Sequence, residues 1–148
     1  MNVRDASISD LDVIVAFIAE EAREAEGRAQ DRATLERGIG TALGDGSIAR
    51  YWLLVDDAGT ACGCTSVVKE WSDWNAGFYW WIQSMYIAPS HRGKGHLATL
   101  IGHIAEAARK AECLDLRLYV HHENHAAIQA YRKVGFKESS YLLMSRPV

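Results

Sequence analysis

A glycine-rich basic loop lies in the stretch Gln83–Ala98, which reads QSMYIAPSHRGKGHLA. Gly93 and Gly95 lack side chains, so the backbone can turn tightly there and bring its N–H groups close to a ligand. Arg92 and Lys94 add positive charge beside these groups. Because backbone N–H groups and basic side chains attract anions, we expect this loop to cradle a phosphate group.

Two strands and a helix should hold this loop in place. The run Phe78–Ile87 predicts a long strand before the loop, and apolar residues at helical spacing predict a helix over Gly93–Lys110 after it. Alternating apolar residues over Leu114–Val120 predict the next strand. A strand, a helix and another strand indicate a βαβ crossover with parallel strands. The positive end of the helix dipole then points at the loop and favours an anion.

The first half of the chain predicts a helical hairpin followed by an antiparallel meander. We expect, in order, a strand at Asn2–Ala6, helices at residues 11–26 and Asp31–Leu43, strands at Tyr51–Val55 and Ala61–Lys69, and a loop at Glu70–Gly77. Most of Trp52, Trp80 and Trp81 should lie in the core, because exposed tryptophans are costly. Cys62 and Cys64, two residues apart in a strand, should share a face as buried free thiols.

The last quarter of the chain predicts one more helix and the edge of the sheet. Asn124 can cap this helix, and Gly135 is a suitable left-handed stop. Phe136–Ser139 and Tyr141–Ser145 should then supply one or two closing strands.

Composition excludes several classes of protein. The 148 residues contain 49% hydrophobic and 24% charged residues, which is close to an average soluble domain, so we expect one domain over residues 1–148. A net charge of −3 argues against a nucleic-acid partner, and three cysteines make no disulfide framework. No apolar run reaches the length of a membrane span, and the N-terminus is unlike a signal peptide. These features favour a cytoplasmic protein.

Two segments together resemble the GNAT superfamily of acyl-CoA N-acetyltransferases. The first is HRGKGHLATL after IAP, and the second combines Asn124, Ala127, Tyr131, Gly135 and Phe136. The run WWIQSMYI with EWSDW before it is similar to a bacterial GNAT subgroup of unassigned acceptor. The family pattern is Q/R-x-x-G-x-G/A, which Arg92 and Gly95 fit, whereas Leu97 stands at the last small-residue position.

The resemblance implies a fold of the α/β (α+β) class. It should contain a mixed, mainly antiparallel twisted sheet of about six to seven strands, flanked by about four helices, with a central parallel βαβ crossover. It also allows a homodimer, as many relatives form.

The resemblance further implies acetyl-CoA as co-substrate and no metal. In the family, the strand before the loop separates from its parallel neighbour, and the pantetheine arm enters the gap. The cofactor-binding residues implied here are Met85, Tyr86, Ile87, Arg92, Gly93, Lys94, Gly95, His96, Leu97, Ala98, Asn124 and Tyr131. A backbone N–H near Ile87 would stabilise the oxyanion of the thioester carbonyl.

The matching tyrosine of the family is a general acid, which implies that Tyr131 donates a proton to the departing CoA thiolate. Asn124 and Tyr131 are seven residues apart and share one helix face. The alternative for Tyr131 is a core aromatic beside Phe136.

Acidic and aromatic residues indicate where an amine acceptor could bind. In this fold the first helix and the loop before the long strand border the acceptor cleft. Glu21 and Asp73 are candidates for the base or for acceptor contacts, and Glu20, Glu24, Trp71 and Trp74 are candidates for acceptor binding, with Glu70 as a further acid. Acids attract a cation and tryptophans can stack on it, so the cluster favours a cationic amine.

The sequence therefore predicts an N-acetyltransferase that moves an acetyl group from acetyl-CoA to a primary amine of a small molecule, peptide or protein. The amine would attack directly, through a tetrahedral intermediate. One alternative is a non-catalytic acyl-CoA-binding sensor. Another is a dinucleotide-binding domain, because Gly93, Gly95 and Ala98 match G-x-G-x-x-A and Asp115 follows. A metal site in the run HHENH, residues 121–125, is a weaker alternative.

Overall fold

The computed structural model describes all residues from 1 to 148. The strands are β1 (Asn2–Asp5), β2 (Arg50–Val55), β3 (Ala61–Ser72), β4 (Gly77–Ile87) and β5 (Asp115–Leu118). The α-helices are α1 (Leu11–Glu26), α2 (Arg32–Gly44), α3 (His96–Lys110) and α4 (His125–Lys133), and the 3-10 turns are η1 (Ile8–Asp10) and η2 (Pro89–His91). No helix combines the length and the apolar character that crossing a bilayer requires.

The five strands form one mixed sheet in the order β1-β2-β3-β4-β5. The first four pair antiparallel, which confirms the predicted meander, and β5 pairs parallel to β4, which confirms the predicted crossover. The β4–β5 ladder ends at the pair Ile82–Leu118, although β4 continues to Ile87. The register with β3 also shifts between Ile82 and Ser84, which leaves Gln83 as the extra residue of a bulge.

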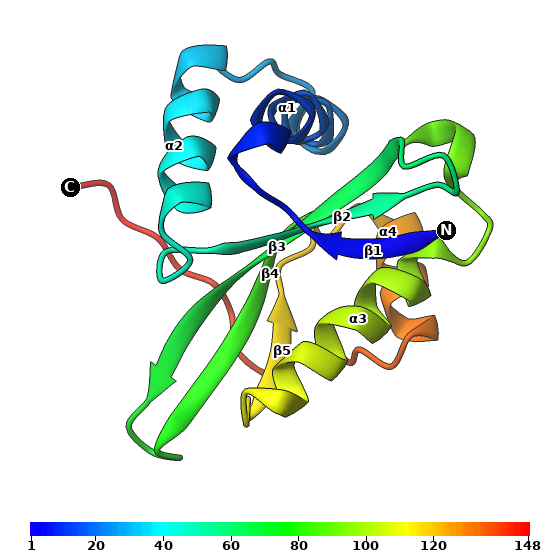
Figure 1. Cartoon of the computed structure of the whole chain (residues 1–148). Helices are drawn as coiled ribbons and strands as arrows, with labels where there is room; N and C mark the ends of the chain where they lie inside the picture. Colours follow the sequence, from blue (N-terminus) through cyan, green and yellow to red (C-terminus); the bar gives the residue numbers. More distant parts are fainter.

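Helices cover both faces of this sheet, with α1 and α2 on one side and α3 on the other (Figure 1). One core cluster joins Ile14 of α1 and Ile39 of α2 to Leu53 of β2. A second cluster joins Ile104 of α3 to Trp52 and Trp80, which are buried as predicted. Successive β2 residues thus enter opposite cores, because side chains alternate along a strand. Trp81 is only half-buried.

Local signals set the ends of the helices near the site. The side chain of Asn124 accepts a hydrogen bond from the N–H of Ala127 and caps α4, as predicted. Gly135 adopts the predicted left-handed conformation after this helix, with φ of 98°. Helix α3 begins at His96 rather than Gly93, because Gly93 and Gly95 both have positive φ.

The prediction of six to seven strands was too high, because the C-terminal segment forms none. Phe136–Ser139 and Tyr141–Ser145 are not strands, and no residue after Phe136 shares a backbone hydrogen bond with the sheet. Tyr141, Leu142, Leu143 and Met144 are 71–89% exposed. Apolar, strand-forming composition does not suffice for a strand, because a strand also needs a neighbour that satisfies its backbone groups.

Three predicted details of the sheet were also wrong. Strand β3 extends to Ser72 by pairing with the start of β4, so the predicted loop Glu70–Gly77 shrinks to residues 73–76. Strand β5 covers only Asp115–Leu118 of the predicted range 114–120. Cys62 and Cys64 lie in different core clusters, because a bulge at Cys62 reverses the alternation.

The packing predicts the effect of core truncation. Leu53 is fully buried, so Leu53→Ala should lower the free energy of unfolding by about 2–5 kcal/mol, measured by urea denaturation. Leu143→Ala is the matched control, because Leu143 is 71% exposed and its loss should change stability by less than about 0.5 kcal/mol. Equal effects of the two substitutions would contradict this assignment of the core.

Candidate active site

The loop between β4 and α3 presents a row of free N–H groups. The backbone N–H groups from Gly93 to Ala98 donate no hydrogen bond within the protein. Three of them, from His96 to Ala98, belong to the first turn of α3, where a helix leaves its N–H groups without partners. A β-carbon added at Gly93 or Gly95 would meet no atom within 4 Å, so the space above the loop is open. The arrangement can bind an anion such as a phosphate.

Leu97, the departure from the family pattern, does not fill this space. Its side chain packs against the core cluster of Trp52 and Ile104 beneath α3. The cradle is made of backbone groups, so the larger side chain leaves their accessibility unchanged.

The basic side chains of the loop form hydrogen bonds and a salt bridge with other groups of the protein. The Nε of Arg92 donates to the carbonyl of Ile87 at 2.7 Å, and its guanidinium forms a salt bridge with Glu24 at 2.9 Å. Lys94 donates to the carbonyl of Ser90. Arg92 therefore ties the loop to the end of β4 and to α1, in addition to its positive charge.

The unpaired edge of β4 meets a half-buried carboxylate. The N–H of Met85 donates to Oε1 of Glu21 at 2.8 Å, which links β4 to α1 across 64 positions of the sequence. Burial raises the pKa of Glu21, and the negative charge of Glu24 raises it further, against the lowering effect of the Met85 N–H. A carboxyl group with a raised pKa is a better proton acceptor than an ordinary glutamate, so Glu21 suits the work of a base.

Tyr131 of α4 is close enough to Glu21 to be influenced by its charge. Burial, together with the negative charge of Glu21, raises the pKa of Tyr131 to about 12. Its ring contacts Phe136 edge-on, with centroids 5.8 Å apart. Tyr131 therefore has the core-like neighbour that its alternative interpretation required, and it also lies within the electrostatic reach of Glu21. The hydroxyl stays protonated at neutral pH and can donate a hydrogen bond.

The structure does not gather the other predicted acceptor residues into one site. Glu20 forms a salt bridge with Arg23, and Glu24 is held by Arg92. Asp73 and Trp74 lie in the turn of the β3–β4 hairpin, whose tip extends beyond the helices (Figure 1). Trp71 is 57% exposed near this tip and packs edge-on against Phe78.

A pocket next to the β4 bulge brings together Glu70, named above as a further acid, and Trp81, expected above as a candidate for the core, with Tyr119, which the sequence did not single out. Its volume is about 340 Å³, and its lining comprises Val68, Lys69, Glu70, Trp81, Ile82, Gln83 and Tyr119. Trp81 and Tyr119 stack with centroids 4.5 Å apart, and the indole N–H of Trp81 donates to Glu70. Side chains alternate along a strand, so Trp81 points to the face of the sheet opposite to that of Trp80. This alternation is the sequence signal that could have placed Trp81 outside the core of Trp80. Tyr119 lies beyond its strand and gave none.

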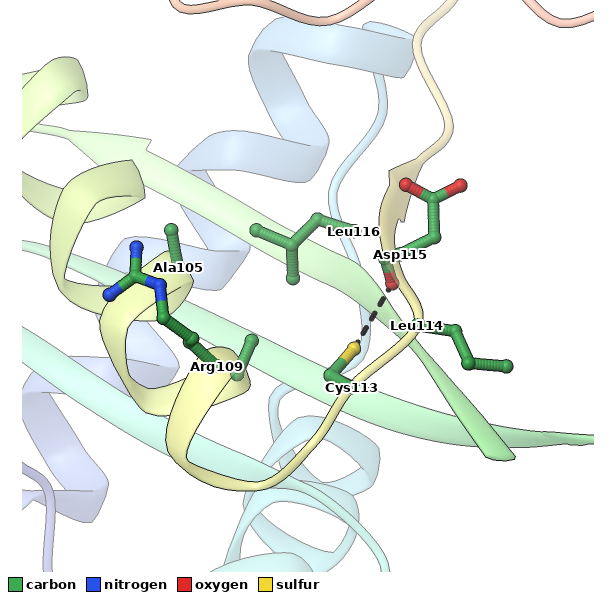
Figure 2. Close-up of a pocket in the computed structure, with 7 residues that line it drawn as sticks. Ala105, Arg109, Cys113, Leu114, Asp115 and Leu116 are labelled. Carbon is green, nitrogen blue, oxygen red and sulfur yellow. Dashed lines mark hydrogen bonds between the residues drawn. The ribbon is translucent and has the colours of Figure 1, made fainter. Parts of the chain in front are cut away.

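A second cavity, of about 220 Å³, lies at the other end of α3 (Figure 2). Arg109 and Ala105 of α3 face Leu116 across it, and the thiol of Cys113 donates to the carbonyl of Asp115 at 3.2 Å. The 15 residues of α3 separate it from the glycine loop by about 20 Å. Its lining is mainly apolar, and it offers no second anion cradle.

Comparisons with known proteins agree with this geometry. The sequence model of the Acetyltransferase (GNAT) family matches residues 14–136. A streptothricin acetyltransferase of Streptomyces lavendulae is 36% identical over 95 residues, which are 64% of this chain and 48% of that protein. The match thus spans about half the length of this curated relative.

Solved structures match over nearly the whole chain. A "possible acetyltransferase" from Clostridium difficile 630 has a TM-score of 0.92 and 31% identity, covering 99% of this chain and 97% of the other. An integron cassette protein from the mobile metagenome of Cole Harbour Salt Marsh has a TM-score of 0.87 at 23% identity, covering 99% and 90%, and shows the fold alone. The predicted fold class is confirmed, and the chain belongs to the GNAT acetyltransferase family.

Proposed function

We propose that this protein transfers an acetyl group from acetyl-CoA to a primary amine by direct attack through a tetrahedral intermediate. The observation that carries the proposal is the row of free N–H groups from Gly93 to Ala98, beside a strand edge that no other strand covers. An acyl-CoA has a pyrophosphate for such a cradle and an extended amide-containing arm for such an edge.

The open edge of β4 is suited to the pantetheine arm. Met85 and Ile87 are two residues apart, so their backbone groups point in the same direction, away from β3. The loop N–H groups would hold the pyrophosphate, and Asn124 and Tyr131 would border the arm from α4. A backbone N–H near Ile87 would stabilise the oxyanion.

Glu21 is the base in this proposal. An amine with a pKa of about 10.4 must lose a proton before it attacks, which costs about 4.6 kcal/mol at pH 7. Glu21 would accept this proton, directly or through a water molecule. Its raised pKa supports the role, because a base works best when its pKa approaches the working pH.

Tyr131 would serve the leaving group. When the C–S bond breaks, the hydroxyl would donate a hydrogen bond to the thiolate sulfur. The second proton of the attacking nitrogen would reach this sulfur through solvent, and Glu21 would release the first proton to solvent. With a pKa of about 12, Tyr131 is a weaker acid than a thiol of pKa about 8.5, so the hydrogen bond to the forming thiolate would contribute most of the stabilisation.

A cationic small molecule is the acceptor that we favour. The chain carries a net charge of −3, which attracts cations in general. The name of the streptothricin acetyltransferase relative supports a small molecule over a protein acceptor.

Calorimetric titration should show that the protein binds acetyl-CoA and does not bind NAD, which would separate this proposal from a dinucleotide-binding domain. Gly95→Glu should abolish binding, because it sets a negative charge among the N–H groups at a residue with φ of 83°. Circular dichroism should confirm that the variant is folded. Unchanged affinity in a folded Gly95→Glu would refute the cradle.

Tyr131→Phe should lower kcat at least tenfold and leave the affinity for acetyl-CoA nearly unchanged, because only the hydroxyl is removed. Thiol release over an amine panel gives the rate, and calorimetry gives the affinity. An unchanged rate would remove the acid role from Tyr131. Acetyl-CoA binding without amine-dependent thiol release in the unaltered protein would favour the non-catalytic sensor instead.

Glu21→Gln should separate catalysis from stability. The raised pKa means that folding disfavours the ionised form of Glu21. Ionised Glu21 therefore lowers the free energy of unfolding. This loss is fully present above the folded-state pKa and vanishes below the unfolded-state pKa, about 4.3. Glutamine cannot ionise, yet its side-chain oxygen can still accept from Met85. We therefore expect the variant to have a higher Tm at pH 7–8 and an equal Tm near pH 4.

The same variant should lose about 100-fold or more in kcat, as expected for a lost general base. Glu36→Gln on α2 is the control: Glu36 forms only a solvent-accessible salt bridge with Arg32, so the substitution should change neither quantity appreciably. A Glu21→Gln enzyme with full kcat would exclude Glu21 as the base.

A further inference from the structure

The pocket beside the β4 bulge adjoins the gap in which the proposed acetyl transfer occurs. Gln83 lines the pocket and is two residues from Met85, whose N–H meets Glu21. Two strand residues span about 7 Å. The pocket lies on the α1 side of the sheet, because Val68 packs against the cluster beneath α1 and α2, whereas Val67 belongs to the cluster beneath α3. It therefore opens toward the same face as Glu21.

Glu70 brings a carboxylate without a cationic partner to this pocket. Its Oε2 accepts from the indole of Trp81, and its other oxygen has no hydrogen-bond partner in the protein. Glu70 forms no salt bridge, unlike Glu20 and Glu24, which are bound by arginines. Of the acids considered for the acceptor, Glu70 is thus the one that both lines a pocket and keeps an oxygen available for a cation.

Neither of the two cations near the pocket forms a salt bridge with Glu70. The guanidinium of Arg117 stacks over Tyr79 at 3.4 Å, lies 5.6 Å from the ring centroid of Trp81, and pairs with Asp115 at 3.7 Å. The Nζ of Lys69 lies over the rings of Phe78 and Trp80. Neither neutralises Glu70 directly, so an incoming ammonium group could pair with its free oxygen.

Aromatic rings form the wall of the same pocket. Trp81 is half-buried and lies opposite Val68 in the β3–β4 ladder, and its ring stacks on that of Tyr119. An ammonium group near the face of a tryptophan or tyrosine is attracted by the ring quadrupole, and a methylene chain packs well against the same surface. A carboxylate with adjacent aromatic rings is therefore suited to a cation on an aliphatic chain.

We propose that Glu70, Trp81 and Tyr119 bind a second cationic group of the acceptor, so that the protein prefers diamines over monoamines. One amine reaches Glu21 and is acetylated, while the other stays protonated at Glu70. This inference rests on the proposed acetyltransferase function. It assigns acceptor recognition to the β3–β4 pocket rather than to the acids of α1.

The test compares linear α,ω-diamines of four to eight carbons with amino alcohols of the same length, using thiol release from acetyl-CoA. In each pair of compounds, a hydroxyl group replaces one of the two ammonium groups, and the size of the molecule changes little. We expect kcat/KM for the best diamine to exceed that of its amino alcohol at least tenfold, beyond the twofold advantage of having two reactive ends. Equal values after this correction would overturn the proposal.

Glu70→Gln should remove this preference, with diamine and amino alcohol within about threefold of each other, mainly through a higher KM for the diamine. The readout is the ratio of the two kcat/KM values, because the amino alcohol lacks the second ammonium group that Glu70 would bind. Trp81→Leu should also raise the KM for the diamine. Glu106→Gln on the opposite face of the sheet is the control and should keep the preference. A Glu70→Gln protein that still prefers diamines would overturn the assignment.

The experiment distinguishes failure of the two proposals. Absence of thiol release with every amine would refute the acetyltransferase function, whereas turnover of amino alcohols and diamines at similar rates would refute only the diamine pocket. Turnover of neutral amines with no turnover of diamines would refute the pocket as well.

Discussion

Five residues of β4, from Gln83 to Ile87, have no strand beside them on the β5 side, and the candidate site depends on this gap. Strand β4 has 11 residues and β5 only 4, so the parallel ladder must stop early. Backbone groups that lose a strand neighbour still need hydrogen-bond partners. Glu21 and Arg92 supply two of them, at the N–H of Met85 and the carbonyl of Ile87. The gap is thus closed by side chains, which can exchange with a ligand more readily than a strand can.

The partners of this edge couple three elements that are distant in the sequence. Glu21 and Glu24 come from α1, Arg92 from the loop, and the charge of Glu21 raises the pKa of Tyr131 in α4. A carboxylate that is partly removed from water is destabilising unless hydrogen bonds offset its desolvation. When Glu21 is ionised at this position, it thus lowers the free energy of unfolding of the protein. Such a cost at the open edge is typical of a functional group rather than a structural one.

Family membership explains the proposed binding site of acetyl-CoA better than it explains the proposed binding site of the amine acceptor. The glycine loop and the start of α3 use backbone groups, so the cradle tolerates Leu97, whose side chain enters the core. The pocket of Glu70, Trp81 and Tyr119 uses side chains at the rim of the sheet, where substitution changes little of the fold. Family resemblance therefore informs the donor side, and the particular side chains of this protein govern the acceptor side.

The sequence by itself determined the order of the elements as far as α4, the crossover around the loop, the cap at Asn124 and the stop at Gly135, because these follow from local periodicity and from the conformational preferences of single residues. It also located the free N–H groups, which follow from glycines before a helix. Tertiary structure alone decided that Glu20 and Glu24 meet arginines, that Glu21 reaches Met85, and that Glu70 meets Trp81. It likewise decided that the apolar C-terminal segment forms no strand. The physical reason is that charge pairing and strand pairing join residues far apart in the chain, and spacing along the sequence does not determine which of them meet.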